Sequence, residues 1–151
     1  MDGFQAAVLN VKARYLNEWV ERRQEIAGCY EKWISELSLP EKAGIKLPKR
    51  MHQGKTKDGW DHVFHQYVIR VPDRAALKSA LEARGVSTMV YYPIPFHKQP
   101  CWTARFGDDW AFPEAEKASA EVLALPMFPE LSETQQKYVV SCIAEHYGIR
   151  S

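Results

Sequence analysis

A proline-free stretch at the N-terminus constrains the fold of this 151-residue chain more than any other feature. All nine prolines lie at or after Pro40, so the residues before it can form an uninterrupted helix. Large apolar side chains recur there at two complementary heptad positions, with Leu9, Leu16, Tyr30 and Leu37 at one and Trp19, Ile26 and Trp33 at the other. The pattern predicts one long helix over Phe4–Leu37, whose bulky stripe packs against the body of the domain.

After this helix the sequence indicates a loop and three strand segments. Residues 42–61 are rich in Gly, Lys and Pro, which predicts a mobile loop. The segments Val63–Val71 and Val86–Tyr91 are dense in β-branched and aromatic residues and are predicted to be strands. A third, short edge strand is expected over Leu123–Phe128, because prolines interrupt that apolar stretch.

Two helices in the middle of the chain are expected from their local start and stop signals. Asp73 is the predicted N-cap of a helix over Arg74–Arg84. Gly85 follows at the position where helices favour a left-handed residue. A second helix is predicted over Glu114–Val122, directly after a proline.

The last helix is predicted to begin at a capping box formed by Ser132 and Gln135 and to end at Gly148. Its expected apolar face consists of Tyr138, Val139, Cys142 and Ile143. Together these elements predict an α+β fold over residues 1–151. We expect a single domain in which a long N-terminal helix accompanies a small sheet covered by helices.

Charge and cysteine content argue against several classes of function. The 20 basic and 19 acidic side chains leave a formal net charge of +1, too little to attract nucleic acid or an anionic membrane. Cys29, Cys101 and Cys142 form no CxxC pair, so we expect small buried residues in a reducing compartment and no metal site. No apolar run reaches the roughly 18 residues of a membrane span, and no signal peptide opens the chain, so a cytoplasmic protein is expected.

Residues 92–100, which read YPIPFHKQP, form the most distinctive loop of the sequence. Each of its three prolines fixes its own φ angle and pushes the preceding residue towards an extended conformation. The predicted result is a stiff loop that displays its side chains at low entropic cost.

Five stretches carry a resemblance to a known family: MDGFQAAVL (1–9), LNEWVERR (16–23), HVFHQYVIR (62–70), GVSTMVYYPIPFHKQP (85–100) and FPEAEKASAEVLALPMFPELSETQ (112–135). In this order they resemble the C-terminal, smaller domain of the DegT/DnrJ/EryC1/StrS sugar aminotransferases, which depend on pyridoxal phosphate. The sequence departs from the family at Gly3 and Phe4, where an acidic residue and Leu are usual. It also has Tyr91-Tyr92-Pro93 where the family often has His-Tyr-Pro.

The resemblance implies the small domain of a fold-type I transferase without the large domain that does the chemistry. In the family, the large N-terminal domain carries the Schiff-base lysine, the phosphate-binding residues and the Asp that faces the pyridine nitrogen. None of the 11 lysines of this chain lies in such a segment, and Lys55 and Lys57 flank Thr56 in a polar loop that would keep their amines protonated. We therefore expect no catalytic residue, no bound pyridoxal phosphate and no transamination from this chain alone.

The resemblance places Tyr91 and Tyr92 at positions that contact the sugar nucleotide and its diphosphate. A Tyr hydroxyl can donate to a phosphate oxygen while the ring flanks a sugar or a base. His97 could donate a charge-assisted hydrogen bond to the same anion. The alternative is that these aromatic residues only pack the loop onto the sheet. His62 and His65 should lie on opposite faces of a strand and are not expected to hold one ion.

Two functions remain open from the sequence. One is a detached C-terminal domain of a sugar-nucleotide aminotransferase that is inactive alone. The other is a non-catalytic module that binds a sugar nucleotide or another protein, including one half of a split enzyme. Loss of a large domain would uncover apolar surface, so the expected partner is a second copy or a separately encoded large domain, with no nucleic acid and no membrane.

Overall fold

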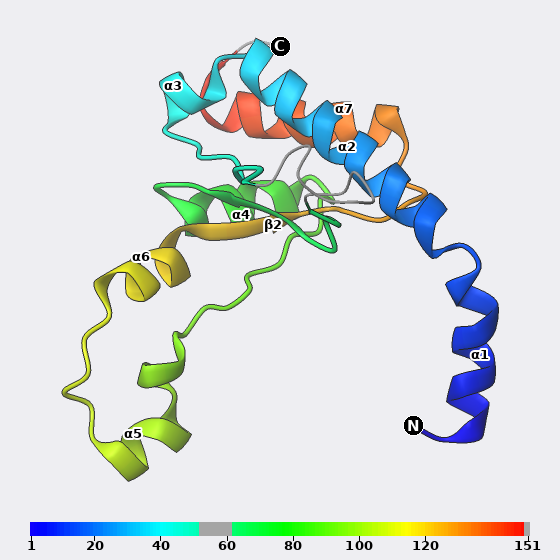
Figure 1. The fold of residues 1–151 in the computed structure, drawn as a ribbon. Helices are drawn as coiled ribbons and strands as arrows, with labels where there is room; N and C mark the ends of the chain where they lie inside the picture. Colours follow the sequence, from blue (N-terminus) through cyan, green and yellow to red (C-terminus); the bar gives the residue numbers. More distant parts are fainter. Residues whose placement is uncertain (52–61, 150–151) are drawn as a thin grey trace.

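Two antiparallel strands lie at the centre of the computed structural model, which describes residues 1–51 and 62–149 (Figure 1). β1 (Tyr67–Arg70) pairs with β2 (Val122–Leu125), so that Tyr67 lies opposite Leu125. Isolated bridges extend this small sheet on both sides, from Lys46 to Arg70 and from Met89 to Ala124.

Helices cover the sheet and also extend away from it. In chain order they are α1 (Gly3–Ala13), α2 (Leu16–Glu36), α3 (Leu39–Ala43), α4 (Arg74–Ala83), the 3-10 helix η1 (Phe96–Lys98), α5 (Pro100–Phe106), α6 (Pro113–Glu121) and α7 (Glu133–His146). α2, α4 and α7 gather around the sheet, whereas α1 and the segment that carries α5 project from the same side of this body (Figure 1). The predicted α+β architecture is confirmed.

The core lies where α2, α4 and α7 meet the sheet. Its largest fully buried side chains are Tyr30, Tyr67, Phe64, Ile26, Ile34, Leu39, Ile45, Ile69, Leu77, Leu81, Leu123 and Ile143. Two polar groups inside it are paired across elements: the Tyr30 hydroxyl donates to the Pro126 carbonyl, and the Gln136 side chain of α7 donates to the Ile26 carbonyl of α2, each at 3.0 Å. The apolar faces predicted for these helices are thus joined into one core.

The single long helix predicted over Phe4–Leu37 is wrong, because the chain breaks at Arg14–Tyr15 into α1 and α2. α2 buries its part of the predicted stripe, including Ile26 and Tyr30, whereas α1 buries no residue. The stripe residues Leu9 and Leu16 are exposed. Since no core contact holds the residues of α1, nothing keeps it in line with α2.

The strand predicted over Val63–Val71 is shorter than expected and begins only at Tyr67. Phe64 adopts a left-handed backbone conformation with a φ of 44°, which strands do not use, and its ring is buried in the core. His62 and His65 therefore precede the strand instead of lying on its two faces. The edge strand predicted over Leu123–Phe128 is β2, and it ends before the proline at position 126.

The strand predicted over Val86–Tyr91 is absent from the described chain, apart from the bridge at Met89. The reason is local: the N–H of Val86 donates to the Leu81 carbonyl at 2.9 Å. Val86 therefore completes the end of α4 instead of pairing along the sheet.

Capping signals located the helices well. Asp73 accepts from the Ala76 N–H at 3.4 Å, and Gly85 has a φ of 74° directly after α4. Ser132 and Gln135 form the predicted reciprocal capping box at the start of α7. On α7 one assignment is wrong: Tyr138 is half exposed, because its hydroxyl donates to the Arg84 carbonyl instead of entering the core.

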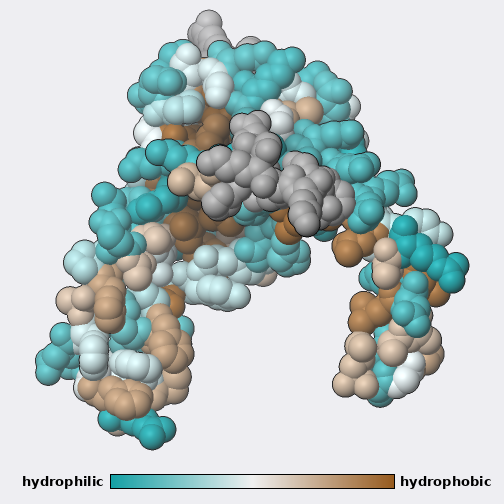
Figure 2. Space-filling view, viewed as in Figure 1, coloured by the Kyte–Doolittle hydropathy of each residue, from teal (hydrophilic) through white to brown (hydrophobic). Residues whose placement is uncertain are grey.

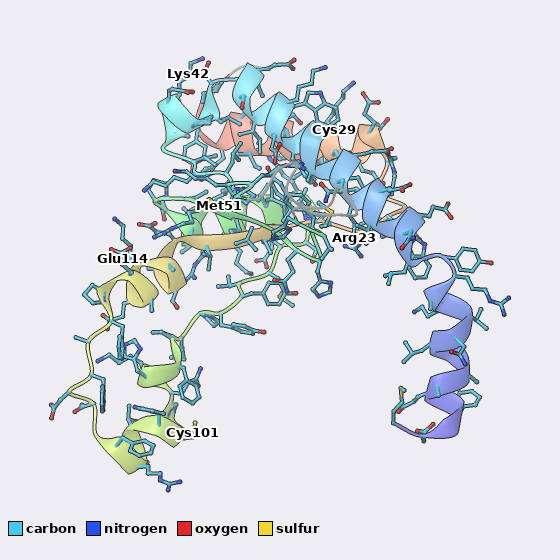
Figure 3. The ribbon with its side chains drawn as sticks, in the orientation of Figure 1. Arg23, Cys29, Lys42, Met51, Cys101 and Glu114 are labelled. Carbon is cyan, nitrogen blue, oxygen red and sulfur yellow. The ribbon has the colours of Figure 1, made fainter. Side chains whose placement is uncertain are left out.

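The cysteines and the loop before β1 complete the comparison. Cys142 is buried as expected, but Cys29 is half-buried and Cys101 is exposed on α5, so the expectation of three buried thiols is wrong (Figure 3). Of the predicted mobile loop over 42–61, residues 52–61 lie outside the described residues. Within the described ranges, no helix combines the length and apolarity needed to cross a membrane.

Candidate functional site

Residues 90–112 form a projecting segment, called the aromatic arm below, that leaves the sheet after Met89 and returns through α6 to β2 (Figure 1). Residues 96–112 of the arm carry a cluster of Phe and Trp rings: Phe96, Trp102, Phe106, Trp110 and Phe112. Trp102 contacts the rings of Phe96, Phe106 and Trp110, and Trp110 stacks on Phe112, with centroids 4.5 to 6.3 Å apart. All but Trp102 are exposed, so the arm carries a large apolar surface with little protein around it.

Tyr91 and Tyr92 lie at the base of this arm. They are 37% and 72% exposed, and their rings meet edge to face at 5.8 Å. Neither hydroxyl bonds to any residue in the described part of the chain. Both phenol hydroxyls are therefore unengaged by the described residues.

The surroundings of His97 differ from those of the two tyrosines. It is 5% exposed, and its Nε2 lies 2.8 Å from Oε1 of Glu116 on α6. The same carboxylate oxygen accepts the Phe112 N–H at 3.2 Å, and the His97 ring packs edge to face on Phe112. The hydrogen bond from His97, helped by that from Phe112, lowers the pKa of Glu116. His97 thus ties the start of the arm to its end.

Arg23 is a positioning residue that reasoning from sequence did not single out. Its Nη1 atom donates to the carbonyls of Phe64, His65 and Met127 at 3.1 to 3.3 Å (Figure 3). It thereby joins the turn before β1 to the turn after β2. The neighbouring Arg22 binds the carbonyls of Pro129 and Leu131 in the same way. The paired arginines in the segment LNEWVERR are the sequence signal from which this role could have been found.

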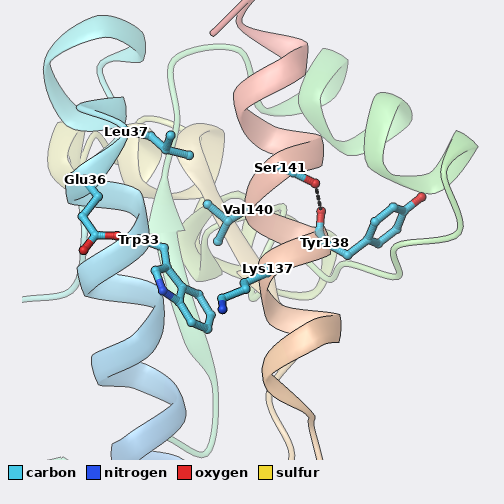
Figure 4. A pocket seen from close by; sticks show the side chains of 7 residues that line it. All are labelled: Trp33, Glu36, Leu37, Lys137, Tyr138, Val140 and Ser141. Carbon is cyan, nitrogen blue, oxygen red and sulfur yellow. Dashed lines mark hydrogen bonds between the residues drawn. The ribbon is translucent and has the colours of Figure 1, made fainter. Parts of the chain in front are cut away.

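A groove of about 380 Å³ lies between α2 and α7 (Figure 4). The Lys137 ammonium lies 5.2 Å from the centre of the Trp33 ring there. Lys137 is also paired with Glu133, and Ser141 donates to the Tyr138 carbonyl. Because these polar groups are engaged within the helices, they do not converge on a ligand.

α1 presents a second exposed apolar surface. Phe4, Val8 and Val11 follow one another at intervals of four and three residues and are all exposed, so they share one face of the helix. Apolar surface is visible on both projections, α1 and the aromatic arm (Figure 2). Two unpartnered apolar elements therefore flank the same side of the body.

The described residues form neither a metal site nor a site for a Schiff base. They contain no cluster of three His, Cys, Asp or Glu side chains that could hold a metal ion. Each lysine within 1–51 and 62–149 is exposed or half-buried, whereas a lysine that forms a Schiff base needs a desolvated amine. These residues alone do not fit pyridoxal phosphate.

Comparison with known proteins gives a consistent family. Residues 1–144 match the model of the DegT/DnrJ/EryC1/StrS aminotransferase family. A pleiotropic regulatory protein of Geobacillus stearothermophilus is 46% identical over 149 residues, which cover 97% of this chain and 37% of that protein. The dTDP-3-amino-3,4,6-trideoxy-alpha-D-glucose transaminase of Streptomyces venezuelae is 32% identical over 145 residues, 96% of this chain and 35% of that enzyme.

Solved structures of aminotransferases also match this chain. The crystal structure of S. venezuelae DesV in complex with a ketimine intermediate has a TM-score of 0.81 and 31% identity, and covers 100% of this chain and 38% of that chain. An aminotransferase of the same family from Brucella abortus has a TM-score of 0.79 and 29% identity. The chain therefore spans little more than a third of the length of the relatives it matches, the share expected for a small C-terminal domain.

Proposed function

Because the chain belongs to the DegT/DnrJ/EryC1/StrS aminotransferase family, we propose that it is the C-terminal domain of a sugar-nucleotide aminotransferase. In this role it presents Tyr91 and Tyr92 to the substrate and relies on another domain for catalysis. Pyridoxal phosphate, when bound by that domain, supplies the electron sink for amino transfer. This chain alone binds no cofactor in the proposal, since its described lysines are solvated.

The observation that carries the proposal is the placement of the tyrosine pair. Tyr91 and Tyr92 lie at the root of the aromatic arm, with exposed rings and hydroxyls that no described residue engages. A phenol hydroxyl donates well to a diphosphate oxygen, and its ring packs on a sugar or a base. His97 contributes by anchoring the loop, because its Nε2 is already bound to Glu116.

The partner in this proposal is a cofactor-carrying large domain, which packs between the two projections. The exposed faces of α1 and the aromatic arm, with Phe4 and Phe96 the most exposed of their rings at 82% and 66%, supply the apolar contact that such a domain needs. The near-neutral charge of the chain leaves apolar burial as the main source of affinity.

A domain exchange tests the proposal. The matched C-terminal portion of the S. venezuelae transaminase is replaced by this chain, and amino transfer to the keto-sugar nucleotide is measured. We expect turnover, and we expect Tyr92→Phe to lower kcat/KM by roughly ten- to a hundredfold, the loss of one hydrogen bond to a charged group.

Tyr138→Phe is the matched control, because that hydroxyl donates to the Arg84 carbonyl on the body. A soluble exchange protein that loads cofactor but transfers no amino group contradicts the proposal. So does full activity in Tyr92→Phe. In the former case, sugar-nucleotide binding without turnover would instead identify a non-catalytic binding module.

A further inference from the structure

A small cleft beside Tyr91 carries chemistry that the proposed function does not use. It has a volume of about 190 Å³, and its walls include His65, Gln66, Ser87 and Thr88 together with residues 124–127. Three parts of the chain thus meet in it: the turn before β1, the segment that leads from α4 into the arm, and the end of β2.

Thr88 is the most informative residue of this cleft. Its side chain is 6% exposed, and its Oγ1 has no hydrogen-bond partner within the described part of the chain. Buried hydroxyls are nearly always paired with protein, ordered water or a ligand. Since Thr88 lines the cleft, a group that enters the cleft is a candidate partner for this hydroxyl.

The chemistry of the walls selects the kind of group. The lining residues include no Lys, Arg, Asp or Glu, and His65 is the one among them that can carry a positive charge, so the cleft offers little that neutralises a phosphate. It offers hydroxyls from Ser87 and Thr88, an amide from Gln66 and the aromatic ring of Tyr91, which suit the hydroxyls and apolar face of a sugar. Its volume is below the roughly 300 Å³ at which pockets for whole drug-sized ligands begin, so one ring fits.

The backbone around the cleft is fixed before any ligand binds. Arg23 holds the carbonyls of His65 and Met127 on two of its edges. Met89 and Ala124 exchange two backbone hydrogen bonds, at 3.2 and 2.7 Å, directly beside Thr88. A preorganised wall of this kind lowers the cost of holding a weak neutral ligand.

We propose that this cleft binds the neutral sugar ring of the ligand, with Thr88 hydrogen-bonded to a ring hydroxyl and Gln66 and Ser87 as further specificity-determining residues. The inference rests on the proposed function for its choice of a sugar as the ligand. It adds that two parts of the ligand are bound at different places: the cleft binds the sugar ring, and the exposed tyrosine pair faces the diphosphate.

The test uses the ¹⁵N-labelled 151-residue chain and two-dimensional NMR. Three probes are titrated separately: UDP-N-acetylglucosamine, N-acetylglucosamine and UDP. Both sugar-bearing probes should shift the amide signals of Gln66, Thr88 and Ala124 in a saturable way, whereas UDP should leave them in place. Equal shifts with UDP, or no shift with either sugar, would overturn the proposal.

Two variants isolate the hydroxyl. Thr88→Val keeps the shape and removes the hydrogen bond, so we expect sugar affinity to fall roughly three- to tenfold in a chain whose spectrum remains folded. Thr88→Ser should restore it, and Thr134→Val, at an exposed threonine on α7, should change nothing. Unchanged affinity in Thr88→Val would overturn the assignment of Thr88 even if the domain exchange restored amino transfer, so this inference and the proposed function can fail separately.

Discussion

His97 and Glu116 decide, at the scale of single residues, how the aromatic arm is held. The sequence indicated a histidine at the end of a stiff loop, free to meet an anion. In the structure the ring is buried against Phe112 and its Nε2 is bound to Glu116. Glu116 lies 19 positions further along the chain, and no local pattern could have linked the two.

The pH response of this contact follows from the direction of the shift. Hydrogen bonds from His97 and Phe112 lower the pKa of Glu116 below its ordinary value of 4.5. A carboxylate with a depressed pKa stabilises the folded arm above its unfolded pKa, and this stabilisation is lost as the pH falls through the folded value. The chemical shift of the Phe112 amide proton should therefore follow the ionisation of Glu116, with a midpoint below pH 4.5.

Glu116→Gln should remove that titration and lower the melting temperature at pH 7, with the difference from wild type shrinking towards pH 3. Glu114→Gln, at an exposed position in the same first turn, is the control and should leave the Phe112 signal unchanged. A Phe112 midpoint at or above 4.5 would contradict the role given to His97.

Secondary structure elements separate into those fixed by local signals and those fixed by pairing. α4, α6 and α7 were predictable because caps and prolines mark their ends within a few residues. The strands were overestimated, because pairing with β2 brings together residues more than 50 positions apart, and β-propensity does not encode a partner. The break between α1 and α2 was missed because the apolar stripe continues through it although its first half buries nothing.

α1 should accordingly contribute little to the stability of the body. Deletion of residues 1–13 is expected to change the free energy of unfolding by less than about 1 kcal/mol, since no side chain of α1 is buried. Ile26→Ala, at a fully buried position of α2, should cost about 2–5 kcal/mol. Urea denaturation followed by circular dichroism compares the two. A deletion that costs as much as Ile26→Ala would show that α1 packs on the body.

The whole molecule combines a well-packed body with two apolar projections that contact little of it (Figures 1 and 2). Such surface is costly in water and is usually covered by a partner. The body could be anticipated from composition and apolar periodicity, but the projections could not, because a sequence pattern cannot distinguish an apolar face that is buried from one that awaits a partner.

Without a large domain, the chain should therefore associate with itself. Sedimentation equilibrium should show an average mass that rises with protein concentration. Val8→Asp should weaken association roughly tenfold, because an unpaired carboxylate in an apolar contact must lose its water. Asn10→Asp adds the same charge on the opposite face of α1 and should have no such effect. A strictly monomeric wild type would argue against α1 as a contact surface.

The backbone bridge between Met89 and Ala124 marks the point at which the chain leaves the sheet for the aromatic arm. From this bridge the chain runs outward at residue 90, and it rejoins the sheet where Val122 and Leu123 of β2 pair with Arg70 and Ile69 of β1. For a flexible loop, each doubling of length adds only about 0.6 kcal/mol to the entropy of closure. A change in the length of the arm should therefore cost the body that holds it little in closure entropy.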